Sequence, residues 1–116
     1  MSKEEQIELG KTLIAQMREC FGQGDRDGTL SAYEQIAGIK ADRSAKLEAT
    51  CLAVRTLVAG KDRTTARRLL DRVSTGEYKR PAHYEFLARA HLELKQYKEA
   101  ATACERAHEL RLASPK

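Results

Sequence analysis

Apolar residues recur every three or four positions along most of the chain, with polar and charged residues between them. Residues 81–93 illustrate the pattern, since Tyr84, Leu87, Ala88 and His91 fall on one side of a helix with 3.6 residues per turn. No segment shows the alternation of apolar and polar residues that is typical of a half-buried β-strand. The pattern therefore predicts an all-α protein.

Turn-forming and capping residues divide the pattern into about six helices. Pro81 suits the first turn of a helix, where no backbone N–H is needed. Glycines interrupt the apolar pattern at residues 22–24 and at residue 60. We expect a first helix from an acidic start after Ser2 to about Phe21 and a second over about 28–39. The third should run from a cap at Asp42 or Ser44 to Ala59, and the fourth from a cap at Asp62 to about Val73. The last two should cover 81–110, on both sides of a turn at Lys95 and Gln96.

A step of 34 residues relates three parts of the chain. It connects Ala32, Ala66 and Ala100. Each of these alanines is followed by apolar residues four and seven positions later, namely Ile36, Leu70 and Cys104, and then Ile39, Val73 and Ala107. Repetition at a fixed period indicates a helical repeat protein.

The last copy resembles the tetratricopeptide repeat (TPR) family. Its residues read Tyr84-x2-Leu87-Ala88-x2-His91 and then Ala100-x3-Cys104-x2-Ala107. The resemblance implies a right-handed α-solenoid of three helix-turn-helix repeats, at about 13–46, 47–80 and 81–114 of a single domain that covers 1–116. It also implies that Cys104 is buried and that the repeat-defining core contains Ala32, Ala66, Tyr84, Leu87, Ala88, Ala100 and Ala107.

The first copy fits this pattern less well than the other two. Its apolar stripe contains Ile7, Ile14, Met17 and Phe21, which are out of phase with the 34-residue step. A terminal repeat has no preceding neighbour to cover it, so an atypical outer face is expected there. We interpret the mismatch as a rotated or slipped helix.

In TPR proteins the first helix of each pair lines a concave groove that binds a peptide or a helix. Arg55 and Arg89 lie at equivalent positions one repeat apart, and two such guanidinium groups suit a segment with acidic and apolar side chains. The alternative is that these arginines pair with Glu48 or Glu85 within their own helices. The resemblance implies a groove made by Met17, Phe21, Cys51, Arg55, Val58, Glu85, Arg89 and Leu92.

Members of the family that bind chaperone tails clamp a carboxylate with Lys and Asn side chains. The corresponding positions here are Met17, Phe21, Leu52, Ala82 and Phe86. None of these side chains can act as a carboxylate clamp. We therefore do not expect binding of chaperone tails.

The net charge of +4 is unevenly distributed. Residues 1–40 hold five basic and seven acidic side chains, whereas residues 41–78 hold eight basic and five acidic ones. The basic segment lacks the interleaved aromatic residues that nucleic-acid-binding surfaces typically use. A solvated outer helix face explains these charges equally well. The basic side chains crowd one helix as Lys61, Arg63, Arg67, Arg68 and Arg72.

No motif predicts catalysis, a cofactor or a metal. The three cysteines, Cys20, Cys51 and Cys104, lack CxxC spacing and indicate reduced thiols. Cys104 and His108 share a helix face, but two donors do not make a metal site.

No apolar run approaches the ~20 residues of a membrane span, so we expect a cytoplasmic protein, of a kind more typical of bacteria.

The sequence thus favours a non-catalytic protein–protein interaction module, acting as an adaptor, scaffold or chaperone. A second hypothesis is a self-assembling structural module that forms homo-oligomers. It depends on the apolar face of the last helix pair, which we expect to be exposed because no capping helix follows Leu112. A nucleic-acid-associated protein is a third and weaker hypothesis.

Overall fold

The computed structural model describes residues 1–113, which form six α-helices and no strand. The predicted all-α architecture is therefore confirmed. Ser114, the last residue of the third predicted repeat, lies outside the described residues. The helices are α1 (Lys3–Gly22), α2 (Arg26–Ala37), α3 (Arg43–Ala59), α4 (Arg63–Ser74), α5 (Pro81–Glu93) and α6 (Tyr97–Ala113).

Short polar side chains cap most of the helix starts. Ser2 and Glu5 form a capping box on α1, in which Ser2 Oγ accepts from the Glu5 N–H at 3.1 Å and Glu5 Oε1 accepts from the Ser2 N–H at 2.9 Å. Asp42, and not Ser44, caps α3 by accepting from the Ala45 N–H. Helix α2 begins at Arg26, with Asp25 as its cap, about two residues before the predicted start at residue 28.

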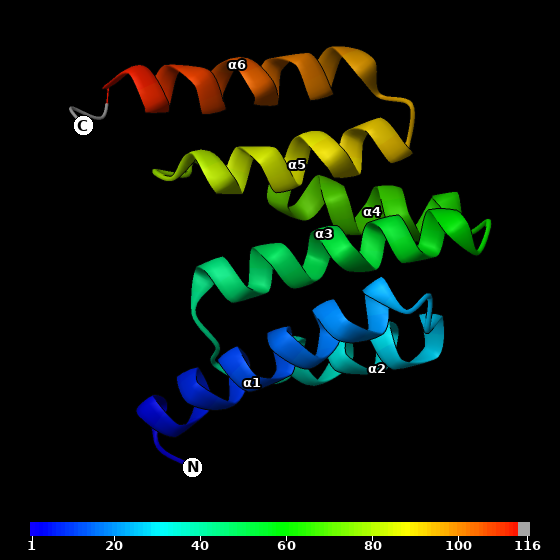
Figure 1. Cartoon of the computed structure of the whole chain (residues 1–116), viewed down its shortest axis with the longest axis vertical. Helices are drawn as coiled ribbons and strands as arrows, with labels where there is room; N and C mark the ends of the chain where they lie inside the picture. Colours follow the sequence, from blue (N-terminus) through cyan, green and yellow to red (C-terminus); the bar gives the residue numbers. More distant parts are fainter. Residues whose placement is uncertain (114–116) are drawn as a thin grey trace.

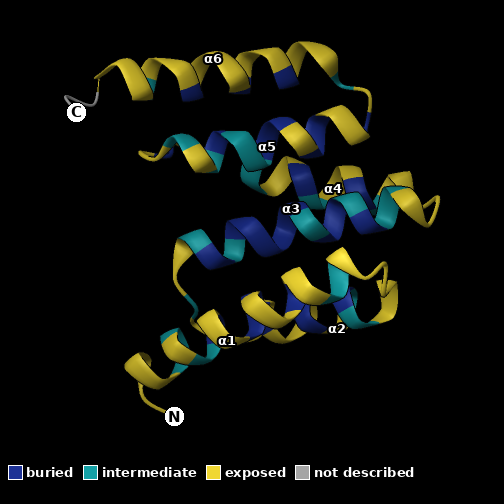
Figure 2. Ribbon diagram, in the orientation of Figure 1, coloured by how far each residue is buried: buried dark blue, intermediate teal, exposed yellow. Residues whose placement is uncertain are grey.

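Each helix packs against the next one in the chain, giving the pairs α1–α2, α3–α4 and α5–α6. The three pairs are stacked in chain order, with α1 and α2 at one end and α5 and α6 at the other (Figure 1). Helix α3 also packs against α1, α2 and α5. As a result, it is buried over much of its surface, as Figure 2 shows.

The turns inside the three pairs have the same backbone structure. Gly24, Lys61 and Lys95 have positive φ angles of 74°, 67° and 59°. Their N–H groups donate to the carbonyl three residues back, at 3.1, 2.9 and 3.0 Å, and the next N–H donates to the carbonyl five residues back, at 2.9, 2.8 and 2.9 Å. These bonds satisfy carbonyls at the end of each first helix. The turns therefore define which residues are equivalent.

This equivalence corrects the predicted register of the first pair. Lys61 and Lys95 are 34 residues apart, but Gly24 and Lys61 are 37 apart. The longer step arises because α3 has 17 residues and α5 only 13. Thr29, and not Ala32, is thus the counterpart of Ala66 and Ala100. All three N–H groups donate to the carbonyl of the residue four positions earlier, which directly precedes the helix.

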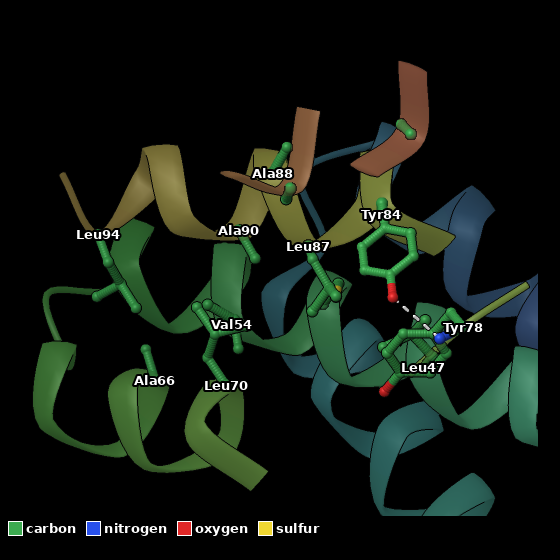
Figure 3. Close-up of a cluster of buried hydrophobic side chains, with 13 residues drawn as sticks. Leu47, Val54, Ala66, Leu70, Tyr78, Tyr84, Leu87, Ala88, Ala90 and Leu94 are labelled. Carbon is green, nitrogen blue, oxygen red and sulfur yellow. Dashed lines mark hydrogen bonds between the residues drawn. The ribbon is translucent and has the colours of Figure 1, made fainter. Parts of the chain in front are cut away.

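The core consists of two clusters on either side of α3. One, which contains Leu13, Met17 and Ile36, lies between α1, α2 and α3. The other joins α3, α4, α5 and α6 around Val54 and Leu70 (Figure 3). All the predicted core residues are buried: Ala32, Ala66, Tyr84, Leu87, Ala88, Ala100 and Ala107.

The prediction that Cys104 is buried is wrong. Its thiol is exposed, as are Tyr97 and Ala101 on the same side of α6. Its counterpart in α4, Leu70, is 0% exposed because α5 packs beside that helix. Within the described residues, no further helix covers the corresponding face of α6. The residues that α6 does bury are Ala100, Ala103 and Ala107.

The connection between α4 and α5 is held in place by Tyr78, a residue that the sequence analysis did not single out. The Tyr78 hydroxyl donates to the Val73 carbonyl at 2.8 Å. Its N–H donates to the Tyr84 hydroxyl at 3.1 Å, and the two rings meet edge to face (Figure 3). Burial raises the pKa of the Tyr78 hydroxyl. The third pair is thus joined to the second through a buried tyrosine.

Substitution of Gly10 by alanine is expected to destabilise the fold, because α1 closely approaches the connection between α2 and α3 at this residue. An added Cβ at Gly10 would lie 2.7 Å from the Cβ of Ala41. We expect Gly10→Ala to lower the free energy of unfolding by about 1–2 kcal/mol, as overpacking outweighs the gain in helix propensity. Gly22→Ala is the control, because nothing lies within 4 Å of its added Cβ. Urea denaturation measures both, and equal effects would contradict the prediction.

Candidate partner-binding groove

The turn register aligns three arginines on the first helices of the three pairs. Arg18 of α1, Arg55 of α3 and Arg89 of α5 each lie three residues before Phe21, Val58 and Leu92, whose carbonyls accept the equivalent turn hydrogen bonds. The sequence analysis found Arg55 and Arg89 but missed Arg18, because a uniform 34-residue step from Arg55 leads to Phe21. A step of 37 residues would have found it.

These arginines border a common hollow of about 200 Å³, which we call the arginine groove. A neighbouring hollow of about 280 Å³ shares Phe21 and Arg55 with it and extends to Glu93 and the turn between α1 and α2. Apolar and charged side chains are therefore interspersed along one surface. The arginine groove is lined by Arg18, Phe21, Glu48, Cys51, Leu52, Arg55, Phe86 and Arg89.

Arg18 is neutralised by Glu48 of α3. Its Nε donates to Glu48 Oε2 at 2.5 Å and its Nη2 donates to Oε1 at 2.6 Å, which is a bidentate pair. The hydrogen bonds that Arg18 donates to Glu48 raise the pKa of Arg18 above its ordinary value. The Glu48 side chain is only 11% exposed, so its hydrogen bonds with Arg18 compensate the cost of burying a carboxylate.

Arg55 and Arg89 are less well paired. Arg55 Nε lies 3.6 Å from Glu93 Oε1, too far for a hydrogen bond, and this buried nitrogen has no hydrogen-bond partner in the described part of the chain. The Arg55 guanidinium lies over the Phe21 ring, 4.7 Å from its centroid. Arg89 is exposed and forms no ion pair with any residue in 1–113. Unbalanced positive charge thus increases from α1 toward α5.

The alternative pairing within each helix is not observed. Glu48 binds Arg18, and Glu85 pairs with Arg111 of α6. Neither carboxylate is therefore the partner that the sequence suggested for Arg55 or Arg89.

The other predicted groove residues fall into two groups. Phe21 and Val58 are half-buried and Leu92 is 50% exposed, so their side chains remain accessible to a partner. Met17, however, is 0% exposed and belongs to the core, and Cys51, 2% exposed, contributes only to the floor of the arginine groove. Their predicted contact role is corrected, because the inward side of each helix packs against its neighbours.

The cysteines are expected to differ in reactivity. Burial, together with the nearby Glu48 carboxylate, raises the pKa of the Cys51 thiol to about 12, whereas Cys104 is exposed on α6. Since the thiolate is the reactive form, iodoacetamide should modify Cys104 in the folded protein and Cys51 only after unfolding. Mass spectrometry of peptides after labelling with and without urea measures this. Rapid labelling of Cys51 in the native protein would contradict its buried position.

Other chemistry is sparse in the part of the chain that the structure describes. Residues 1–113 contain no group of three or more His, Cys, Asp or Glu side chains placed to bind a metal ion. None of the described helices is long and apolar enough to cross a bilayer. The arginines of α4 that the sequence analysis considered for nucleic acid are exposed: Arg63, Arg67, Arg68 and Arg72.

Comparison of the chain with protein-family models, curated proteins and solved structures found no match.

Proposed function

We propose that this protein is a non-catalytic protein–protein interaction module that holds a peptide or helical segment of another protein in the arginine groove. Such a module serves as an adaptor, scaffold or chaperone. The observation that carries the proposal is the row of Arg18, Arg55 and Arg89, of which only the first is fully neutralised by a carboxylate. Exposed arginine beside apolar side chains is typical of binding surfaces.

The proposal includes the finer description of the fold, as three TPR-type repeats in a right-handed α-solenoid. The repeated turn hydrogen bonds support it, as does the stacking of helix pairs in chain order. In this arrangement α1, α3 and α5 form the binding face. A partner segment would lie across all three helices.

The side chains of the groove specify the chemistry of the partner. Arg55 and Arg89 favour carboxylates, which can accept two parallel hydrogen bonds from a guanidinium group. Leu52 and Phe86 are half-buried in the same groove, and Leu92 is exposed near its edge. The expected segment therefore presents acidic residues with apolar residues between them.

Affinity capture from a cell lysate tests the proposal. The wild-type protein should retain a partner that Arg55→Glu with Arg89→Glu loses, with a fall in affinity of about a hundredfold or more, because both contacts become repulsive. Arg67→Glu with Arg68→Glu on α4 is the control, since it makes the same change of charge outside the groove. Equal capture by wild type and the groove variant, with circular dichroism showing that both are folded, would refute the proposal.

Self-assembly remains a second candidate, because the outward face of α6 is partly apolar. Tyr97 is 63% exposed and Leu112 is 73% exposed, and Cys104 lies between them. The equivalent face of α4 buries Leu70. Light scattering over a range of concentrations distinguishes the two functions. A monomer mass at every concentration would exclude self-assembly through this face.

A further inference from the structure

A third hollow lies on the opposite side of α3 from the arginine groove. It has a volume of about 380 Å³, within the range of small-molecule sites. Helix α2 contributes Tyr33 and Ile36, and the end of α4 and the following connection contribute Arg72, Thr75 and Tyr78. The remaining wall comes from α3, with Arg43, Lys46, Leu47, Ala49 and Thr50.

The charged side chains around this hollow are all basic. Arg43, Lys46 and Arg72 line it, and no carboxylate does so. None of the three forms an ion pair with a residue in the described range 1–113. Two acidic residues adjoin these cations in sequence, Asp42 before Arg43 and Asp71 before Arg72, and neither lines the hollow. Asp42 instead caps α3 by accepting from the Ala45 N–H at 2.9 Å. Cations gathered without a counter-charge repel one another, and a bound anion would relieve this repulsion.

Part of the lining is fixed by contacts within the fold. The Arg43 guanidinium lies over the Tyr78 ring, 4.5 Å from its centroid. Tyr78 is itself fixed by its hydrogen bonds to Val73 and Tyr84, and Figure 3 shows the bond to Tyr84. Thr50 Oγ1 donates to the Lys46 carbonyl at 2.8 Å, which anchors its hydroxyl within the hollow. The Arg43 cation is therefore pre-positioned, whereas the Thr50 and Tyr78 hydroxyls already donate their protons to backbone carbonyls.

The surroundings add to the positive potential. His83 bonds to Ser44 at 2.9 Å, next to Arg43 at the start of α3. Burial lowers the pKa of His83, and the nearby Arg80 and Arg43 lower it further, whereas Asp42 acts in the opposite direction. Protonation of His83 is thus disfavoured first by its burial and then by the positive charge of Arg80 and Arg43.

We propose that the hollow binds a small phosphate ester, with the phosphate between Arg43, Lys46 and Arg72 and the organic part against the half-buried Tyr33 and Val73. Ile36, Leu47 and Ala49 form the buried apolar floor beneath them. A phosphate carries up to two negative charges and three acceptor oxygens, which match several cationic donors better than one carboxylate does. The apolar floor favours an ester over inorganic phosphate. The site is independent of the arginine groove, since α3 presents different side chains to the two hollows.

The test is a titration of the ¹⁵N-labelled protein with phenyl phosphate, followed by NMR. The amide signals of Thr50, Thr75 and Gly76 should shift in a saturable manner, and inorganic phosphate should bind more weakly. Lys46→Gln and Arg72→Gln should each weaken binding about tenfold, the value of one charged hydrogen bond. Arg68→Gln is the matched control, because Arg68 lies one turn before Arg72 on α4 and does not line the hollow.

Each outcome decides the proposal. Saturable shifts that depend on Lys46 and Arg72, but not on Arg68, support a phosphate site. If vesicles containing phosphatidic acid bind with the same dependence, the natural phosphate belongs to a lipid headgroup; if they do not, it belongs to a soluble ester. Absence of saturable shifts, or shifts that none of the variants alters, overturns the site. Binding of a short RNA that depends equally on Arg68 would replace it with a basic surface along α4.

Discussion

Leu70→Ala is expected to lower the free energy of unfolding by about 3–5 kcal/mol. Leu70 is 0% exposed and packs in the cluster that joins α3, α4, α5 and α6. Truncation would remove its buried methyl groups and leave a cavity among neighbours that cannot all move inward, because this cluster unites the second and third helix pairs. Urea denaturation monitored by circular dichroism gives the change.

Cys104→Ala is the matched control for this prediction. Cys104 is the counterpart of Leu70 in the third helix pair, 34 residues later, but its thiol is exposed. We expect a change within about 0.5 kcal/mol, as for other surface substitutions. A large loss from Cys104→Ala in a concentrated sample would instead indicate that a second copy covers α6. A small loss from Leu70→Ala would contradict the packing of α4.

Arg18→Ala is expected to lower the free energy of unfolding by about 1–3 kcal/mol, although the Arg18 side chain is 58% exposed. The loss arises from its partner, because Glu48 is only 11% exposed and would keep a negative charge without its bidentate hydrogen bonds. A pair of two exposed side chains would contribute much less. Urea denaturation again gives the change.

Two variants separate this cause from simple loss of side-chain contacts. Gln16→Ala removes an exposed residue of the same helix and should change stability by less than about 0.5 kcal/mol. Arg18→Met combined with Glu48→Met should recover most of the loss, because it removes both charges together. If Arg18→Ala behaves like Gln16→Ala, the pair does not stabilise α1 against α3.

Local signals in the sequence were sufficient to predict the helices. The caps Asp42 and Asp62 and the first-turn Pro81 lie where the structure begins α3, α4 and α5. These signals act through bonds within a few residues, so they do not depend on the rest of the fold. The spacing of apolar residues similarly identified Tyr84, Leu87 and Ala88 as core residues.

The register of the first helix pair required the tertiary structure. An extra turn in α3 lengthens one repeat to 37 residues, and an alanine at position 32 coincided with the expected 34-residue step. Only the backbone hydrogen bonds of the turns show that Thr29 is the true counterpart of Ala66, which in turn aligns Arg18 with the other arginines.

The sequence by itself determined the helices and the apolar side of most of them, because caps and periodicity are local properties. The tertiary structure alone decided how charges are shared and which faces are covered. Glu48 binds Arg18 and Glu85 pairs with Arg111, pairings that join different helices and leave Arg89 without an ion pair within residues 1–113. Cys104 fits a core pattern but is exposed, because burial depends on a neighbouring helix and not on the residue itself.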